Sequence, residues 1–336
     1  MSEPVLEVVE LDVRIRSRAG LVRPVRGVSL AVAAGETLAL VGESGCGKSI
    51  TALAIAGLLP PGASICGGRV ALRGERLEQL DNAGWNRVRG GGIGMVFQNP
   101  MSSLNPTMRV GEQIAEGLIA RRGLSRGAAL AQAVRLLERM RVPRARERAR
   151  QYPFEFSGGM LQRALIALAV ACEPALLIAD EPTTALDVTV QREVLALLRE
   201  LQRDAGMALL LITHDLGVVA QAADRVAVMY GGHIVEHAPV DRIFHATAHP
   251  YTAGLKLALP DRHRRGQPLQ VIAGSPPDLS QPPPGCAFYA RCPHALNVCA
   301  EGAVPEFTPA PGHGSRCWLL HPQVAAPLRL SEREHD

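Results

Sequence analysis

Short apolar runs alternate along the chain with longer stretches in which apolar residues recur every three or four positions. Four runs are rich in Val, Leu and Ile and are bounded by turn residues or charges: Thr37–Val41, Ala175–Ala179, Ala208–Thr213 and Arg225–Met229. Such runs predict buried parallel strands. The periodic stretches Ala128–Arg141 and Val190–Asp204 predict amphipathic helices. Strands that alternate with helices predict an α/β sheet.

Three regions depart from this alternation. The segments Val5–Val13 and Val28–Val32 predict antiparallel strands ahead of the strand Thr37–Val41, and therefore an added β layer. Segment 99–156 has little strand pattern and several basic helices, which predicts a helical subdomain at about 99–165, inserted between two halves of the sheet. From about residue 260 the sequence PLQVIAGSPPDLSQPPPG predicts irregular structure. We expect a main domain over 1–258 and an extension over 259–336.

Composition narrows the class of protein. With 336 residues the chain exceeds the usual size of one hydrophobic core, and its 47% hydrophobic content is typical of a globular protein. A net charge of +4 is small and does not by itself indicate nucleic acid. The charged N-terminus lacks the apolar core of a signal peptide. The most apolar stretch, Ala164–Ala179, is interrupted by Glu173 and Pro174 and is too short to cross a bilayer. We therefore expect a cytoplasmic chain whose membrane role depends on a partner subunit.

A glycine-rich segment follows the strand Thr37–Val41 and opens a helix at Ile50. It matches the pattern G-x-x-x-x-G-K-[ST] between a strand and a helix, as the pattern requires. Glycines allow backbone N–H groups to turn around phosphate oxygens, and a helix N-terminus favours their charge. This P-loop predicts MgATP binding, with Lys48 on the β- and γ-phosphates and Ser49 on Mg²⁺. The predicted ATP-binding residues here are Gly42, Glu43, Ser44, Gly45, Cys46, Gly47, Lys48, Ser49 and Ile50.

Two adjacent carboxylates, Asp180 and Glu181, follow the strand Ala175–Ala179. They lie at its carboxyl end, which is the edge where α/β sheets bind ligands. Asp180 is predicted to hold Mg²⁺ through water, and Glu181 to orient and deprotonate the attacking water. An isolated Asp-Glu pair would more often be a solvated turn that caps the next helix, but a P-loop in the same chain favours catalysis.

A third motif narrows the class of P-loop ATPase. Ser157-Gly158-Gly159-Met160, preceded by Phe156 and followed by LQRALIALAVA, resembles the signature motif of ATP-binding cassette (ABC) ATPases. Physically it is a second helix N-terminus suited to an anion, although S-G-G before a helix is more often only a cap. The resemblance implies that this turn meets the γ-phosphate held by the P-loop of another subunit, so that two cassettes enclose ATP.

Further matches follow in the order of that family. Gln98 after IGMVF resembles the Q-loop glutamine, Thr184-Ala185-Leu186-Asp187 resembles the D-loop, and His214 after LLLIT resembles the switch histidine. The resemblance implies a P-loop NTPase (RecA-like) ABC cassette with an antiparallel β subdomain and a helical subdomain. It also implies that Glu181, His214 and Gln98 are catalytic, that Ser49, Gln98 and Asp180 serve Mg²⁺, and that His214 and Gln98 contact ATP. Asp187 belongs to the implied D-loop.

Other segments resemble the oligopeptide/dipeptide importer branch. They are FQNPMSSLNP at 97–106, HPYT at 249–252, and a tail with the pattern G-C-x-F, R-C-P, C, H and C. The resemblance implies an ATPase on the cytoplasmic face of the inner membrane that energises peptide uptake. The implied partners are a homologous second cassette, two permease subunits and an extracytoplasmic peptide-binding protein. Nickel chelates or glutathione are alternative cargoes, because a motor subunit does not touch its substrate.

Four of the seven cysteines crowd the tail at the spacing C-x5-C-x6-C-x17-C: Cys286, Cys292, Cys299 and Cys317. The segment is poor in apolar residues, so a metal that staples a small irregular domain is expected. Thiolates select zinc or an iron–sulfur cluster. The C-x2-C knuckles usual for structural zinc are absent, and the family resemblance implies [4Fe–4S], which we favour over zinc. Scattered buried thiols are the third possibility.

The chain departs from the family pattern in two places. Between Leu11 and Val41 it has no aromatic residue to stack on adenine, so Val22 or Arg23 is the expected base contact. Met160 and Leu161 replace the usual Gln and Arg of the signature region, but neither is expected to touch the phosphates.

A soluble ABC ATPase of DNA repair or translation is the competing class. One cassette, a near-neutral charge and no long heptad run disfavour it.

Overall fold

A computed structural model describes residues 3–17, 20–184, 186–259 and 271–324 of the chain. The chain divides into two compact units. The first unit comprises Met1–Leu6, Ala31–Thr37 and Ala71–Ile212. The second unit comprises Glu7–Leu30, Leu38–Val70 and Thr213–Asp336.

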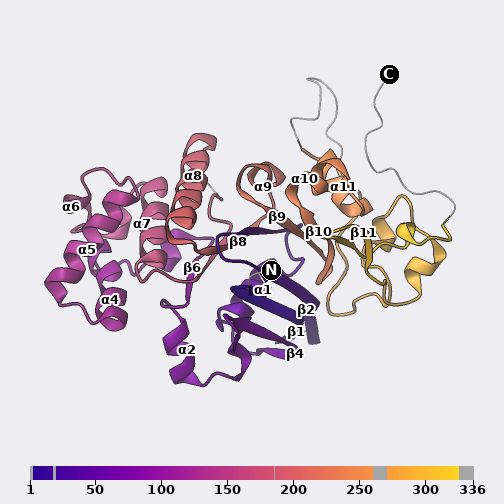
Figure 1. The fold of residues 1–336 in the computed structure, drawn as a ribbon, viewed down its shortest axis with the longest axis horizontal. Helices are drawn as coiled ribbons and strands as arrows, with labels where there is room; N and C mark the ends of the chain where they lie inside the picture. The colour runs from indigo at the N-terminus through magenta and orange to yellow at the C-terminus, as the bar shows by residue number, and fades with distance from the viewer. Residues whose placement is uncertain (1–2, 18–19, 185, 260–270, 325–336) are drawn as a thin grey trace. The chain divides into compact units, whose positions relative to one another are not determined.

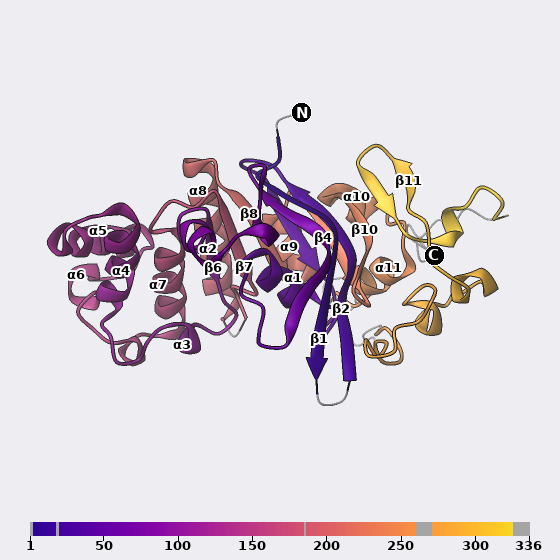
Figure 2. The same cartoon turned by 90° about the horizontal axis from the view of Figure 1, so that it is seen from below.

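The β layer of the second unit is formed by long strands near the N-terminus. Strands β1 (Leu6–Ser17), β2 (Gly20–Val32) and β4 (Ala63–Leu72) are neighbours in the order β2-β1-β4 and lie side by side in Figures 1 and 2. The predicted strands were shorter, because β2 begins at Gly20 rather than Val28. Strand β4 was not predicted, since its first seven positions are half-buried or exposed and include two glycines.

A second set of strands in this unit surrounds β3 (Thr37–Val41). Strand β9 (Arg225–Tyr230) pairs with β3 in parallel, with Ala39 opposite Val226, and β10 (His233–Pro239) pairs with β9 antiparallel. All five residues of β3 are buried, which explains why its sequence is a continuous apolar run. The helices of this unit are α1 (Lys48–Ile55), α9 (Leu216–Ala222), α10 (Val240–His245) and α11 (Pro250–Leu257).

The C-terminal segment of this unit contains more regular structure than its sequence predicted. Strand β12 (His313–Ser315) pairs antiparallel with β11 (Phe307–Ala310) and also with β10, where Ser315 lies opposite Glu236. Short 3-10 turns make up much of the rest: η4 (Tyr289–Arg291), η5 (Asn297–Ala300) and η6 (Trp318–Leu320). Residues 268–270 of the predicted irregular segment lie outside the described residues.

The strands of the first unit centre on β7 (Leu176–Asp180). It pairs in parallel with β6 (Ile93–Val96) and with β8 (Ala208–Thr213), so the carboxyl ends of all three strands share one edge. Every residue of β7 and β8 is buried. The predicted strand boundaries differ from these by one residue at each end of β7 and not at all for β8.

Helices dominate the rest of the first unit. Its elements outside the three strands are β5 (Glu75–Arg76), η1 (Leu77–Gln79), α2 (Asn82–Val88), α3 (Pro100–Ser103), α4 (Val110–Arg122), α5 (Arg126–Arg139), α6 (Ala145–Arg148), η2 (Pro153–Glu155), α7 (Gly158–Val170) and α8 (Val188–Ala205). Helices α4, α5, α6 and α7 pack together, as Figure 1 shows. The predicted helices at Ala128–Arg141 and Val190–Asp204 correspond to α5 and α8 with shifted ends. Within the described ranges, no helix is both long and apolar enough to span a bilayer.

Candidate functional site

The P-loop turns tightly between β3 and α1 in the second unit. A β-carbon at Gly42 would lie 2.2 Å from the carbonyl oxygen of Met229, and one at Gly47 would lie 2.1 Å from that of Pro24. Gly47 also has a φ of 112°, in the region that favours glycine. Gly42 and Gly47 are therefore required by the packing of the loop itself.

Lys48 lies inside this turn and is 5% exposed. Its Nζ donates to the carbonyl oxygens of Gly42 at 2.7 Å and Glu43 at 2.9 Å. The thiol of Cys46 lies 3.7 Å from the same ammonium group, and burial raises the pKa of that thiol. The loop therefore holds a single cation, and no thiolate neutralises it at neutral pH. Such a cation at a helix N-terminus suits a phosphate ligand.

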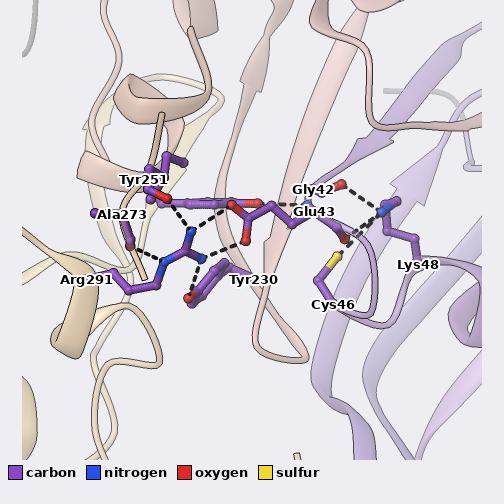
Figure 3. A network of polar contacts seen from close by, with 9 residues as sticks. Gly42, Glu43, Cys46, Lys48, Tyr230, Tyr251, Ala273 and Arg291 are labelled. Atoms are coloured by element: carbon purple, nitrogen blue, oxygen red, sulfur yellow. Dashed lines mark hydrogen bonds and ion pairs between the residues drawn. The ribbon is translucent and has the colours of Figure 1, made fainter. Parts of the chain in front are cut away.

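Residues far along the chain support the P-loop at Glu43. The backbone N–H of Glu43 donates to the Tyr251 hydroxyl at 2.8 Å, and its carboxylate accepts from both Nη atoms of Arg291 at 2.7 and 3.0 Å. Figure 3 shows the guanidinium group of Arg291 facing this carboxylate, with Lys48 on the other side of the loop. Burial raises the pKa of the Tyr251 hydroxyl, which therefore stays protonated.

Asp180 and Glu181 end the central strand of the first unit. Asp180 is buried, and Glu181 has a φ of 47°, which is strained for a residue with a side chain. The Glu181 carboxylate accepts from the Gln98 amide at 2.9 Å and from the Thr184 hydroxyl at 2.8 Å. The structure thus brings Gln98 and Glu181 together, and two donors fix the direction of the carboxylate.

Ser157 begins helix α7 in the first unit. It caps the helix, since its hydroxyl accepts from the backbone N–H of Met160 at 3.4 Å. Ser157 and Gly158 are exposed, and a β-carbon at Gly158 would meet no atom within 4 Å in the part of the chain that the structure describes. Gly159 is close-packed, because its β-carbon would lie 2.9 Å from Cγ1 of Val190. The helix end is therefore open to an external ligand and is not buried in the core of its own unit.

Two more predicted residues lie at helix ends. Asp187 caps α8 by accepting from the N–H groups of Thr189 at 3.0 Å and Val190 at 2.9 Å. His214 is exposed directly after β8, next to Asp215, which caps α9. Ala185 of the predicted D-loop segment lies outside the described residues.

The four tail cysteines line one cavity of the second unit. The cavity is small, with a volume of about 10 Å³, and its walls include Cys286, Cys292, Cys299 and Cys317. Burial raises the pKa of Cys286 to about 11 and that of Cys317 to about 12, so both are neutral thiols here. Over the described ranges, no three His, Cys, Asp or Glu side chains are arranged as a metal site.

His313, the histidine of the tail pattern, pairs with a carboxylate instead of lining this cavity. Its Nε2 lies 2.9 Å from Oε1 of Glu236, which is fully buried on β10. The same carboxylate accepts from the N–H groups of Ala248 at 2.7 Å and His249 at 3.1 Å. Glu236 therefore joins β12 and the start of α11 to β10.

Comparison with known proteins gives concordant results. Residues 25–184 match the family model "ABC transporter", and residues 235–299 match "Oligopeptide/dipeptide transporter, C-terminal region". The chain is 48% identical to the dipeptide transport ATP-binding protein DppD of Bacillus subtilis (strain 168), over 94% of this chain and 95% of that protein. It is also 48% identical to the oligopeptide transport ATP-binding protein OppD of the same organism, over 95% of this chain and 90% of that protein.

The chain belongs to the ATP-binding proteins of the oligopeptide/dipeptide ABC transporter family. It is an ABC-type ATPase. Its fold is that of an ABC cassette: a dimeric structure of the ATP-binding cassette MJ0796 bound to ADP and Pi superposes with a TM-score of 0.64 at 26% identity, covering 70% of this chain and 98% of that one.

The expected adenine contacts of this ABC ATPase lie on β2. Val22 is half-buried there, and the Arg23 guanidinium is 3.0 Å from a carboxylate oxygen of Asp12. The backbone N–H of Arg23 donates to the carbonyl oxygen of Leu279 at 2.9 Å. An ion-paired arginine on a strand offers its planar face for stacking more readily than a mobile one.

Sequence reasoning gave no role to several residues that organise the site. Tyr251 and Arg291 lie in the segments HPYT and R-C-P that resemble the peptide branch, but no contact was predicted for them. Tyr230 and Glu236 belong to no recognised motif. Their partners are distant in the chain, so no local pattern indicates them. An unexplained charged residue inside a motif, such as Arg291 in R-C-P, was the one available indication.

Proposed function

We propose that this ABC ATPase energises the import of dipeptides or oligopeptides across the cytoplasmic membrane. The observation that carries the proposal is the 48% identity, over nearly the whole chain, to proteins named for dipeptide and oligopeptide transport. The match of residues 235–299 to the C-terminal region of such transporters adds to it. The chain would act as a peripheral subunit on the cytoplasmic face of the membrane.

The proposed chemistry assigns one task to each polar group. Lys48 would bind the β- and γ-phosphates, and Ser49, Gln98 and Asp180 would hold Mg²⁺, which would neutralise charge on the phosphates. Glu181 orients the attacking water and accepts its proton, and His214 hydrogen-bonds the γ-phosphate. The hydrogen bonds from Gln98 and Thr184 to Glu181 support this role, because they fix the direction of the carboxylate.

We propose a composite site between two cassettes, and the exposed end of α7 supports it. The turn Ser157-Gly158-Gly159-Met160 would bind the γ-phosphate held by a partner cassette, with Asp187 at the contact between the two. Its exposure supports this proposal, as does the space beside Gly158, where a β-carbon would meet none of the described residues within 4 Å. We propose a homologous second cassette, two permease subunits and an extracytoplasmic peptide-binding protein as partners.

Peptide uptake by cells tests the proposal. The chain is expressed with its permease subunits and binding protein in a host that lacks its own peptide importers, and uptake of labelled dipeptide is measured with wild type and Glu181→Gln. Uptake that requires Glu181 supports the proposal. Uptake of nickel chelates or glutathione in place of peptides would assign another cargo, and no association with membranes would indicate a soluble ABC ATPase.

We propose further that the four tail cysteines hold a [4Fe–4S] cluster, with zinc as the alternative. The donor set fits either group, since four thiols line one cavity and thiolates are the preferred ligands of both. Trp318 also lines this cavity, and its buried Nε1 has no hydrogen-bond partner among the described residues. An indole N–H of this kind is a suitable donor to a cluster sulfur atom.

When bound, the cluster would staple the tail by replacing four S–H protons with Fe–S bonds. Elemental analysis of anaerobically purified protein tests the assignment. Iron and inorganic sulfide in equal amounts are expected, and Cys286→Ser and Cys317→Ser should lower both. Zinc without iron would favour zinc over the cluster. If neither metal is found, the cysteines are buried thiols that bind no metal.

We propose residues 1–258 as the nucleotide-binding domain and 259–336 as the extension that this group stabilises.

A further inference from the structure

Arg291 connects the cysteine-rich tail to the P-loop. It directly precedes Cys292, whose side chain lines the cysteine cavity, and its guanidinium group reaches the P-loop residue Glu43. We infer that Arg291 is a positioning residue of the nucleotide site, which fixes the P-loop through Glu43. The inference rests on the proposed ATP-binding role of the P-loop and adds a residue from the tail to that site.

Every N–H group of the Arg291 guanidinium has an acceptor. Nη1 donates to a carboxylate oxygen of Glu43 at 2.7 Å and to the Tyr230 hydroxyl at 3.0 Å. Nη2 donates to the other oxygen of Glu43 and to the carbonyl of Ile272, both at 3.0 Å. Nε donates to the carbonyl of Ala273 at 2.9 Å, as Figure 3 shows. Only a planar fork with five donors satisfies this set, so lysine cannot replace it.

The surroundings make this ion pair stronger than a surface pair. The Arg291 side chain is 6% exposed and that of Glu43 is 25% exposed. The guanidinium carbon lies 5.7 Å from the ring centre of Tyr230 and 5.9 Å from that of Phe288, which excludes water from two sides. A bidentate pair that is shielded from water holds its partners in one geometry.

Glu43 transmits this constraint to the lysine that would bind phosphate. Its carboxylate is held by Arg291, its N–H by Tyr251, and its carbonyl oxygen accepts from Lys48 Nζ at 2.9 Å. Three groups of one residue are therefore fixed at once. Loss of Arg291 would free the Glu43 side chain, leave a carboxylate beside the incoming phosphates and weaken nucleotide binding by both effects.

Nucleotide binding by the full-length protein tests this inference. We expect Arg291→Gln to raise the Kd of a fluorescent MgATP analogue by about tenfold, since loss of a shielded charged hydrogen bond corresponds to about one factor of ten. In the assembled transporter KM for ATP should rise by the same factor while kcat changes by less than about twofold, because ground-state and transition-state binding are lost together. Arg291→Lys should recover only part of the affinity.

A double-mutant cycle separates positioning from a general loss of stability. Glu43→Gln should also weaken binding, and Arg291→Gln combined with Glu43→Gln should bind no worse than the weaker single variant, because both remove the same pair. Arg69→Gln is the matched control, since the Arg69–Glu7 pair of the same unit is largely exposed, and its Kd should equal that of wild type.

The outcomes distinguish this inference from the proposed function. If wild type binds MgATP and Lys48→Ala does not, the P-loop assignment stands; wild-type affinity in folded Arg291→Gln, or additive effects in the cycle, then overturns the role of Arg291 alone. If Arg291→Gln does not fold, Glu43→Gln carries the test, and an unchanged Kd overturns the inference. Failure of wild type itself to bind MgATP would instead reject the proposed function.

Discussion

The P-loop of the second unit and the signature turn of the first unit are both glycine-containing turns that begin a helix, yet they are held in opposite ways. Around the P-loop, backbone oxygens of Met229 and Pro24 leave no room for a β-carbon, and Lys48 is buried among loop carbonyls. At the signature turn, Ser157 and Gly158 are exposed, and a β-carbon at Gly158 would have no described residue within 4 Å.

This difference shows which of the two turns needs its glycines for packing within one chain. The P-loop needs glycine for its own packing, so its geometry exists before any ligand arrives. A β-carbon at Gly158 would meet no described residue within 4 Å, so packing within the unit does not require glycine there, in agreement with the proposed composite site. The carboxylate Glu181 lies between these extremes, since it is half-buried and held by two side chains.

The largest effect is expected from Glu181, the proposed catalytic carboxylate. Glu181→Gln keeps the shape of the side chain but removes the base, so ATP turnover by the assembled transporter should fall by about 10² to 10⁴-fold with nucleotide binding retained. Phosphate release measures it. Glu200→Gln, which alters an exposed ion pair with Arg141 in the same unit, should leave turnover unchanged. Normal turnover in Glu181→Gln would remove this residue from the mechanism.

The signature turn can be tested with a substitution that preserves its cap. Asp is as good an N-cap as Ser, so Ser157→Asp should fold normally, but it places a negative charge where the γ-phosphate of the partner is proposed to bind. We expect turnover to fall on the order of 100-fold while the separate chain still binds ATP. Ser125→Asp at the cap of α5 is the control. Equal turnover in both variants would contradict the composite site.

A pair of glycine substitutions tests the comparison itself. Gly42→Ala should lower the free energy of unfolding by about 1–3 kcal/mol, because its β-carbon collides with the backbone at Met229. Gly158→Ala should change it by less than about 0.5 kcal/mol, yet lower transporter turnover. Denaturant unfolding and ATPase assays measure the two effects. If Gly158→Ala is as destabilising as Gly42→Ala, the two turns do not differ as described.

The smallest effect is the pH dependence of stability that comes from His233, which follows a glycine that contacts the P-loop. The backbone N–H of Gly232 donates to the carbonyl oxygen of the P-loop residue Cys46 at 3.1 Å. The next residue, His233, is buried close to Arg26 and Arg316, and its burial together with these two charges lowers its pKa to about 4. The unfolded chain, with a histidine pKa near 6.5, binds more protons between these values, so stability falls as the pH drops through this window.

Between pH 7 and pH 5.5 the His233 contribution amounts to a loss of about 1 kcal/mol. His233→Gln should remove that part of the pH dependence in denaturant unfolding. An unchanged pH slope in His233→Gln would show that the imidazole already protonates normally in the folded protein.

Much of the fold could be predicted because it depends on local patterns. The buried strand β8 was predicted with the observed ends, and β7 within one residue, since continuous apolar runs bounded by turns have few alternatives. Strand β4 was missed because it is half exposed, and the beginning of β2 because Val22 to Arg26 lacks a clear alternation. The strands β11 and β12 were missed because their pairing with β10 depends on residues far away in the chain.

The sequence by itself determined the P-loop, the carboxylate pair at the end of β7 and the four cysteines, since each is a chemical pattern tied to a local backbone shape. Tertiary structure alone decided that Arg291 pairs with Glu43 across 248 residues, that His313 pairs with Glu236, and that the four cysteines share one cavity. Local sequence restricts backbone angles within a few residues, whereas these contacts depend on the path of the whole chain.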